Sequence, residues 1–440
     1  MGTFERAIAR ITSATPVRRS GTVTAISAGT VTVSGLGGVV ALGDRLVFPG
    51  AAMAGGEVVA IAGDDAILLP DGPAEGLVPG QRAERLGAAG LAPDDGWIGR
   101  IVDPFGLALD GRALLPGRVA RPLRAAPPPA ARRGRLGGRL ATGSALFDTL
   151  LPIVRGQRIG LFAGSGVGKS TLLARLARGL QADVAVIGLV GERGREVREF
   201  CEDVLGPDGM ARSVVVAATS DQPPVVRRRC AWAAMAVAEH FRDQGRHVLL
   251  LLDSVTRFAE AHREIAVAAG EAAALRGYPP SVAQAIMQLA ERAGPGEEGR
   301  GDITAVFSVL VAGSDMEETV ADILRGVLDG HVVLDRKIAE RGRFPAVDLL
   351  RSVSRSLPRA ADADENALIA RARGVLAAWD RAEMMVQAGL YAAGSDPAVD
   401  EAIRLFPLLD AFLSEGSAAP EAGFAQLAAI LSGGVTAGGT

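Results

Sequence analysis

The sequence is poor in the residues that bind zinc or build disulfides. Its 440 residues include two cysteines, Cys201 and Cys230, and four histidines, none of them in close ligand spacing. This scarcity argues against a structural zinc site, and two lone cysteines suit a reducing compartment. Lysine is as rare as cysteine, since Lys169 and Lys337 are the only two lysines among the 47 lysine and arginine residues.

Long apolar runs and a strong net charge are also missing. No stretch offers the roughly 20 uninterrupted apolar residues that span a bilayer, and the first residues lack the layout of a signal peptide. The formal charge of −3 gives no general reason to expect nucleic acid as a partner. We therefore expect a cytoplasmic globular protein with roughly two to four domains.

Short alternating runs from Gly21 to about residue 90 predict the first domain. GTVTAISAGTVTVSGLGG alternates apolar and polar residues, and further short runs follow between Gly, Pro and Asp. This pattern favours a small closed β-barrel, which we place at residues 19–95. Residues 21–96 contain three arginines against nine acidic residues, the opposite of the balance that a nucleic-acid-binding barrel needs.

The middle of the chain predicts a parallel sheet covered by helices on both faces. RIGLFAG, DVAVIGLVG, SVVVAAT, RHVLLLLD and ITAVFSVLVAG are short, nearly continuous apolar runs between helical stretches. We assign this domain to residues 96–360. Within it, residues 116–139 are rich in Pro, Gly and Arg and predict a partly extended connector, either solvated or carrying a basic patch.

The two ends of the chain predict further segments. Residues 361–430 indicate a helical domain, and residues 431–440 a disordered tail. In residues 1–18, Phe4, Ile8 and Ile11 share one helical face. This segment is either a frayed terminal turn or an amphipathic helix that docks on a partner or a membrane surface.

The stretch FAGSGVGKST, residues 162–171, nearly matches the phosphate-binding pattern G-x-x-x-x-G-K-[ST]. It lies between an apolar run and a helical run, the context that lets backbone N–H groups converge on phosphate oxygens. Ala163 replaces the first glycine, and it suits that position if its φ is negative, because only a small side chain is needed there.

The loop also predicts a role for each of its residues. Gly164, Gly166 and Gly168 allow the positive φ angles and close backbone approach that a phosphate nest requires. Lys169 is expected to reach the outer phosphates and Ser170 to coordinate Mg²⁺. The predicted nucleotide-binding residues of the loop are Ala163, Gly164, Ser165, Gly166, Val167, Gly168, Lys169, Ser170 and Thr171.

Two other apolar runs end in carboxylates. HVLLLLD places Asp253 at the end of a strand, where P-loop enzymes hold the magnesium shell. VAVIGLVGERGRE places Glu192 after another strand, where a glutamate near the γ-phosphate can polarise the attacking water. For Glu192, a charged surface loop is the alternative interpretation.

Several longer motifs resemble one family. GLFAGSGVGKSTLL, GERGREVREF, LLLLDSVTRFA, GYPPSV, VLDGHVVLDRKIAERGRFPAVD and SVSRSLP resemble the ATPase of the flagellar type III protein-export apparatus. That family is similar to the α and β subunits of rotary F-type ATP synthases. The resemblance covers residues 20 to 415 and implies an α/β fold: a RecA-like P-loop parallel-sheet core between an N-terminal β-barrel and a C-terminal helical domain.

The resemblance also implies roles for residues far from the loop. Arg355, in SVSR, matches an arginine finger inserted into the site of a neighbouring subunit, and Phe344 matches an aromatic residue that stacks on adenine. A core phenylalanine is the alternative for Phe344. Tyr391 is a candidate for the other side of the base, and Arg193 and Arg257 match charged positions around the phosphates.

As a function, the resemblance implies an Mg²⁺-dependent ATPase of protein export, with Lys169, Glu192, Arg193, Asp253 and Arg355 as catalytic residues and ATP as substrate. A virulence-type secretion ATPase and a non-catalytic ring subunit are alternatives. Non-catalytic subunits carry Gln where this chain has Glu192, which favours the enzyme. A nucleic-acid translocase is disfavoured by the acidic barrel.

The implied partners follow from the family as well. We expect a homo-hexamer, a dimeric regulator bound to residues 1–18, and a central stalk protein at the pore loop 277–282. Export gate and chaperone–substrate complexes complete this set, with no nucleic acid. The family implies a cytoplasmic protein associated peripherally with the inner membrane at the flagellar base.

Overall fold

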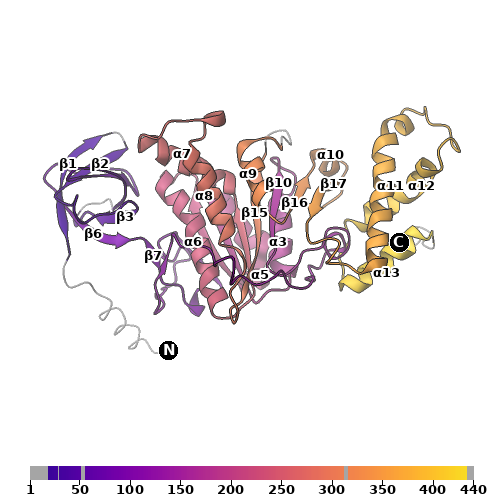
Figure 1. Ribbon diagram of the computed structural model, residues 1–440, viewed down its shortest axis with the longest axis horizontal. Coiled ribbons are helices and arrows are strands. Elements are labelled where there is room, and N and C mark those ends of the chain that lie inside the picture. Colours follow the sequence, from indigo (N-terminus) through magenta and orange to yellow (C-terminus); the bar gives the residue numbers. More distant parts are fainter. Residues whose placement is uncertain (1–17, 28, 51–54, 312–315, 434–440) are drawn as a thin grey trace.

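The computed structural model describes residues 18–27, 29–50, 55–311 and 316–433. Residues 1–17 of the predicted N-terminal segment and residues 434–440 of the predicted tail lie outside this range. Figure 1 shows three parts side by side along the longest axis: a barrel, a central sheet flanked by helices, and a group of C-terminal helices. The predicted fold class is confirmed.

Six antiparallel strands form the closed barrel, in the order β1-β2-β5-β4-β3-β6. Their alternation of apolar and polar residues turns one set of side chains inward, as in β2, where Val31 and Val33 are fully buried. The strands are β1 (Ser20–Ser27), β2 (Thr30–Ser34), β3 (Asp44–Val47), β4 (Gly56–Ala62), β5 (Asp65–Pro70) and β6 (Arg82–Ala88).

The central sheet has the order β17-β16-β10-β15-β13-β11-β12-β8, with β14 paired to β15. All neighbours are parallel except the β16–β17 and β14–β15 pairs. Its strands are β8 (Arg100–Val102), β10 (Arg158–Ala163), β11 (Val184–Glu192), β12 (Ser213–Thr219), β13 (Val248–Asp253), β14 (Gly294–Pro295), β15 (Asp302–Leu310), β16 (Gly330–Leu334) and β17 (Val347–Ser354).

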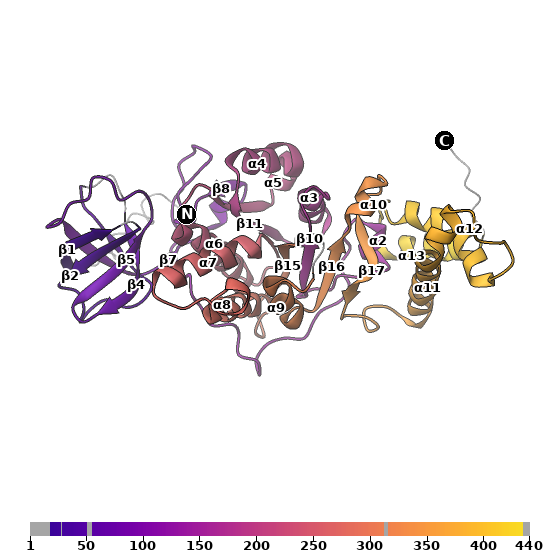
Figure 2. The same ribbon diagram turned by 90° about the horizontal axis from the view of Figure 1, so that it is seen from above.

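Helices cover both faces of this sheet, as Figure 2 shows. Alternate residues of β11 pack into two separate cores, Ile187 with the α3 side and Val186 with the α6 side. The helices are α2 (Ala145–Asp148), α3 (Lys169–Gly179), α4 (Gly194–Glu199), α5 (Gly206–Met210), α6 (Pro224–Asp243), α7 (Val255–Ala268), α8 (Pro280–Glu291), α9 (Thr319–Val327) and α10 (Arg336–Glu340).

The connector 116–139 runs along the central domain and is tied to it. Its β9 (Arg121–Pro122) pairs with β7 (Gly90–Leu91). Three of its arginines bind acidic residues elsewhere: Arg121 to Asp243 at 2.5 Å, Arg133 to Glu291 at 3.0 Å and Arg139 to Glu365 at 2.9 Å. These side chains therefore hold the connector in place instead of forming a free basic patch.

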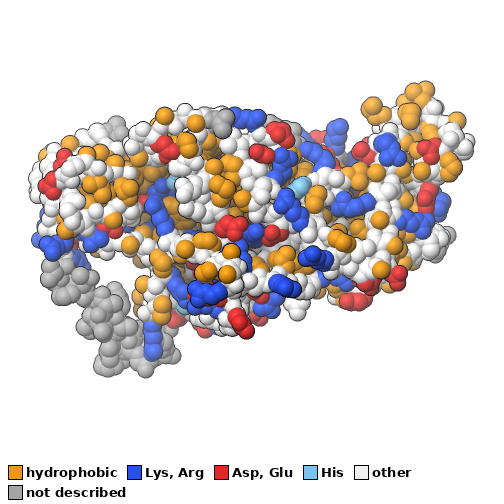
Figure 3. All heavy atoms as spheres, in the orientation of Figure 1, with side chains coloured by type: hydrophobic (Ala, Val, Ile, Leu, Met, Phe, Trp, Pro, Cys, Tyr) orange, Lys and Arg blue, Asp and Glu red, His pale blue; other side chains and the backbone are white. Residues whose placement is uncertain are grey.

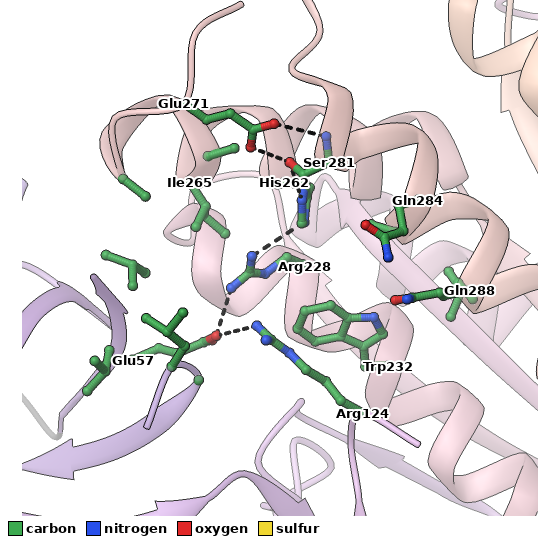
Figure 4. Close-up of a pocket in the computed structure, with 18 of the residues that line it drawn as sticks. Glu57, Arg124, Arg228, Trp232, His262, Ile265, Glu271, Ser281, Gln284 and Gln288 are labelled. Carbon is green, nitrogen blue, oxygen red and sulfur yellow. Dashed lines mark hydrogen bonds and ion pairs between the residues drawn. The ribbon is translucent and has the colours of Figure 1, made fainter. Parts of the chain in front are cut away.

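A chain of hydrogen bonds joins the barrel to the central domain around a cavity of about 390 Å³ (Figure 4). Glu57 of β4 accepts from Arg124 and from the buried Arg228 of α6, both at 2.8 Å. Arg228 donates to Nδ1 of His262 at 3.4 Å, and Nε2 of His262 lies 3.1 Å from the Ser281 hydroxyl at the start of α8. The chain thus runs from the barrel to the segment 277–282.

Three helices form the C-terminal part: α11 (Ala363–Gln387), α12 (Pro397–Phe412) and α13 (Pro420–Leu431). Asp362 and Glu365 form a capping box at the start of α11. Figure 3 shows hydrophobic side chains gathered at the outer tip of this part, where Met384 and Leu390 are 83% and 78% exposed. No helix in the described ranges is long and apolar enough to cross a membrane.

Candidate active site

The phosphate-binding loop connects β10 to α3 as predicted. Ala163 is the last residue of β10, fully buried, and its carbonyl accepts the Val311 N–H at 3.0 Å. Among the described non-glycine residues, only Arg276 has a positive φ, so Ala163 is unstrained there. The replacement of the first glycine is therefore compatible with an intact loop.

Two glycines of the loop need their conformational freedom. Gly166 and Gly168 have φ angles of +76° and +83°. Gly164 does not share this region, and a Cβ added there would lie at an ordinary 3.7 Å from the Val311 carbonyl oxygen. Of the three glycines that allow a positive φ, Gly166 and Gly168 therefore use this freedom and Gly164 does not.

The side chains of the loop divide between the core and the outside. Val167 is buried and anchors the loop in the α3-side core. Ser165 and Gly166 are exposed, as are Ser170 and Thr171 in the first turn of α3. This arrangement leaves polar groups and backbone N–H groups at the N-terminus of an 11-residue helix open to an anion.

Lys169 brings the two predicted carboxylates together. Its ammonium forms an ion pair with Asp253 and lies 3.9 Å from Oε1 of Glu192. Glu192 ends β11, Asp253 ends β13, and Lys169 begins α3 after the loop that follows β10. All three therefore lie where the parallel strands have their carboxyl ends. The sheet order inserts β15 between β10 and β13, and Ser308 of β15 donates a 2.7 Å hydrogen bond to Oδ1 of Asp253.

The environment of Glu192 favours its protonated form. Burial, and then the charge of Asp253, raise the pKa of Glu192 to about 7, against the opposing charge of Lys169. A carboxyl group with a pKa near neutrality can both accept and release a proton under physiological conditions. The alternative of an ordinary charged surface loop does not fit this partly buried side chain, which is 21% exposed.

The two arginines predicted near the phosphates lie at the rim. The Arg193 side chain is 80% exposed and pairs with Glu196 at 3.4 Å. Arg257, in the first turn of α7, pairs with Glu260 at 2.9 Å. It lies close to Gly191, where an added Cβ would come within 3.3 Å of the Arg257 Cβ. Neither guanidinium forms an ion pair with Glu192 or Asp253, whose ion-pair partner is Lys169.

Phe344 lies against the loop. Its ring is 49% exposed, which excludes the alternative of a core phenylalanine, and a Cβ on Gly168 would come within 3.2 Å of its Cδ1. The neighbouring Arg343 is buried and donates to the carbonyls of Pro345 and Val347, both at 2.9 Å. This support presents an exposed aromatic face beside the loop.

Tyr391 and Arg355 lie away from the loop of their own chain. Tyr391 follows α11, and its hydroxyl lies 2.9 Å from the Asp396 carbonyl oxygen and 3.0 Å from Oδ1 of Asp400 in the first turn of α12. This connection is at the outer tip of the C-terminal helices in both ribbon views. The structure therefore does not bring Tyr391 to the face of a base held by Phe344.

Arg355 directly follows β17, which is antiparallel to β16. The register pairs Val353 with His331, and His331 with Gly160 of β10. Arg355 is thus level with the first residue of β10, about five residues or roughly 16 Å below the loop. Its guanidinium is exposed and donates to the Arg325 carbonyl at 3.1 Å.

The segment 277–282 shares a cavity with the loop. Tyr278 and Arg276 line a space of about 770 Å³ together with Ala163, Ser165 and Arg257. The guanidinium of Arg263 lies 5.1 Å from the centre of the Tyr278 ring. The cavity places this segment next to the rim of the candidate nucleotide site.

Comparison with known proteins identifies the family. Residues 143–354 match the ATP synthase alpha/beta family, nucleotide-binding domain, and residues 361–429 match the T3SS EscN ATPase C-terminal domain. A flagellum-specific ATP synthase of Caulobacter vibrioides is 49% identical over 366 residues, which cover 82% of each chain. The chain belongs to the flagellar and type III secretion ATPases of the ATP synthase alpha/beta family. This result confirms the predicted resemblance and makes the protein an ATPase.

Two other members show how widely this ATPase family extends. A type 3 secretion system ATPase of Xanthomonas euvesicatoria is 44% identical over 360 residues, covering 82% of this chain and 81% of that protein. The assembled ATPase EscN of enteropathogenic E. coli, solved with its central stalk EscO, matches with a TM-score of 0.86 and 34% identity. That match covers 93% of this chain and 100% of EscN.

Ser308 is the contact of this ATPase site that the sequence analysis missed. It is a polar residue within the apolar run ITAVFSVLVAG, and it is fully buried. A hydroxyl inside a buried strand needs a partner, which is a signal that something polar lies beside it. The sequence alone did not reveal that the partner is Asp253.

Proposed function

We propose that this ATPase hydrolyses Mg²⁺-bound ATP in the flagellar type III protein-export apparatus, with Glu192 as the group that polarises the attacking water. The observation that supports it best is the convergence of Lys169, Asp253 and Glu192 at one edge of the sheet. A lysine for phosphate, a carboxylate for the metal shell and a second carboxylate with a pKa near 7 are the parts that phosphoryl transfer to water needs.

Substrate binding would begin at the loop. The N-terminus of α3 and the exposed polar groups of the loop attract the phosphates, and Lys169 exchanges Asp253 for phosphate oxygens. Phe344 offers its half-exposed ring to adenine. Glu192, still close to this position, accepts a proton from the water that attacks the γ-phosphorus, while the bond from this phosphorus to the bridging oxygen breaks and ADP leaves.

The residues at this edge fit a magnesium ion. Mg²⁺ in phosphate sites takes one or two protein oxygens and completes its shell with phosphate and water oxygens. The exposed Ser170 hydroxyl and the Asp253 carboxylate would hold it, and the ion would neutralise charge on the phosphates. No cluster of three or more His, Cys, Asp or Glu side chains suited to a metal occurs in the described ranges, so phosphate oxygens are needed to complete the shell.

Arg355 would act on a neighbouring subunit in a homo-hexameric ring. Its position, roughly 16 Å below its own loop, suits an arginine that reaches the γ-phosphate held by the next subunit. A guanidinium is always charged and presents a planar fork to phosphate oxygens. Arg193 and Arg257 at the rim would add positive charge as the ring closes.

The partners follow the same proposal. The segment 277–282 would contact a central stalk protein, and a relative, EscN, was solved in complex with its central stalk EscO. A regulator dimer would bind residues 1–18, export gate and chaperone–substrate complexes would dock during transport, and the protein would associate peripherally with the inner membrane at the flagellar base. Hydrolysis would serve the delivery and unloading of export substrates.

A virulence-type secretion ATPase is the second candidate, because the Xanthomonas relative is 44% identical.

Replacement of Glu192 by Gln tests the chemistry. The amide keeps the size of the side chain and cannot accept a proton, so ATP binding should persist while steady-state hydrolysis falls by at least about 100-fold. Binding is measured with a fluorescent ATP analogue and hydrolysis by phosphate release. Hydrolysis by Glu192→Gln near the wild-type rate would sink the assignment.

Deletion of the gene tests the biological role. Loss of motility and of exported flagellar subunits, both restored by the wild-type chain, supports the flagellar proposal. Normal motility combined with loss of secretion of virulence-type substrates would favour the second candidate.

A further inference from the structure

Ser308 occupies a defined place between the two strands that carry the phosphate loop and Asp253. It pairs with Leu161 of β10 on one side, while its neighbour Phe307 pairs with Leu252 of β13 on the other. Ser308 is therefore level with Asp253. Side chains at one level of adjacent parallel strands point to the same face, which explains the 2.7 Å hydrogen bond between them.

Oδ1 of Asp253 carries two donors in this structure. The Lys169 ammonium and the Ser308 hydroxyl both bind that oxygen. The two donors differ in mobility, because Lys169 has a long flexible stem and must leave to bind phosphate. Ser308 is fully buried in the middle of a strand, so its single O–H cannot donate to bulk water instead.

We propose that Ser308 is a positioning residue for the reaction: it holds Oδ1 of Asp253 after Lys169 has moved to the phosphates, and so keeps Oδ2 directed at the magnesium shell. This inference rests on the proposed function. A carboxylate that loses all its donors can rotate about its Cβ–Cγ bond, and a fixed donor on one oxygen removes that freedom.

The role predicts a selective defect. Ser308→Ala removes the donor and leaves the loop, Lys169 and Glu192 in place. A hydrogen bond to a charged group is strong enough to change a binding constant about tenfold. We expect the gain in ADP affinity that Mg²⁺ provides to shrink by about tenfold, while ADP affinity in EDTA stays unchanged. The kcat should fall by a similar factor, with a smaller change in KM.

The matched control is Ser213→Ala. Ser213 is also fully buried, its hydroxyl donates to the Gly209 carbonyl at 2.6 Å, and it begins β12 at the other end of the sheet. Both variants lose one buried hydrogen bond, so any general loss of stability is shared between them. Ser308→Thr keeps a hydroxyl on the strand and should restore the effect of Mg²⁺, and Ser308→Cys, nearly the same size as serine, should lie between Ser308→Ala and wild type.

The experiment titrates ADP into the full chain with and without Mg²⁺ and measures hydrolysis in parallel. An Mg²⁺ effect in Ser308→Ala equal to that in wild type and in Ser213→Ala would overturn the proposal. If Ser308→Ala does not fold, a wild-type Mg²⁺ effect in Ser308→Cys would overturn it instead. If the wild-type chain does not hydrolyse ATP, the proposed function fails, and the Mg²⁺ dependence of ADP binding still decides the role of Ser308.

Discussion

The charge of Glu192 is set by two carboxylates and one lysine in its surroundings. Burial and the charge of Asp253 raise the pKa of Glu192, the charge of Lys169 lowers it and the Glu196 side chain raises it, with a net pKa of about 7. Below that pH the side chain is mainly protonated and cannot accept a proton from water. The activity of the free enzyme should therefore depend on pH in the neutral range.

We expect kcat/KM for ATP to rise with pH through a midpoint near 7, because this parameter reports ionisations of the free enzyme. Glu196→Gln removes a hydrogen bond and a charge that raise the pKa of Glu192, so the midpoint should move to lower pH. Rates at pH 5.5 to 9 check both statements. A midpoint that does not move in Glu196→Gln would show that another group controls the profile.

The aromatic candidates differ in what their positions allow. Phe344 is half-exposed beside Gly168, so Phe344→Ala should weaken ADP binding about tenfold through loss of stacking, with little effect on stability. Tyr391→Ala is the matched control and should leave ADP affinity unchanged, because its hydroxyl binds Asp400 at the outer tip. Both affinities are measured by calorimetry, and a loss in Tyr391→Ala equal to that in Phe344→Ala would contradict this placement.

At the scale of elements, the sequence predicts the strands that are followed by candidate catalytic residues. Asp253 and Glu192 could be located because a buried parallel strand is a continuous apolar run and the polar residue at its end marks the carboxyl end of the sheet. Lys169 could be located because the phosphate-loop pattern contains it. Their mutual contact could not be predicted, since it depends on the order of strands and on β15 lying between β10 and β13. The Ser308 contact was missed for the same reason.

Local conformation was harder to predict than strand content. The sequence does not show which of the three loop glycines take a positive φ, and in the structure the loop turns at Gly166 and Gly168 but not at Gly164. The connector was predicted to be solvated or to carry a basic patch of arginines. In the structure, carboxylates distant in sequence, such as Asp243 and Glu365, bind these arginines instead. Such partners are far apart in sequence and carry no local pattern.

The junction between barrel and central domain offers a prediction about stability. Glu57 is the carboxylate that two arginines share, and its partner Arg228 has a side chain only 4% exposed. Glu57→Gln would leave a buried guanidinium without a counter-charge and should destabilise the protein by about 3–5 kcal/mol. Urea unfolding of the full chain measures this change.

Asp95→Asn is the control for that measurement. Asp95 pairs with Arg246 at 2.8 Å, but its side chain is 59% exposed, so its loss should cost less than about 1 kcal/mol. Equal unfolding midpoints for the Glu57 and Asp95 variants would contradict a stabilising role of the junction.

For the whole molecule, the distance between Arg355 and the loop of its own chain bears on whether two subunits share one nucleotide site. If one subunit completes the site of the next, specific hydrolysis activity should rise with protein concentration as subunits assemble. Arg355→Ala should lower activity at saturating concentration about 1,000-fold while ATP still binds. A specific activity that stays constant on dilution to low nanomolar protein would contradict a site shared between subunits.

Because β17 runs antiparallel to β16, Arg355 lies far from the loop of its own chain, and this separation has a genetic consequence. If Arg355 completes the site of the next subunit, a subunit with Glu192→Gln still supplies Arg355, and a subunit with Arg355→Ala still supplies Glu192. Two inactive alleles should then complement each other when expressed together. With random mixing in equal amounts, about a quarter of the interfaces would combine the two intact halves. In an equal mixture with the wild type, either allele should leave about half of the interfaces intact, because each site takes Glu192 from one subunit and Arg355 from the next.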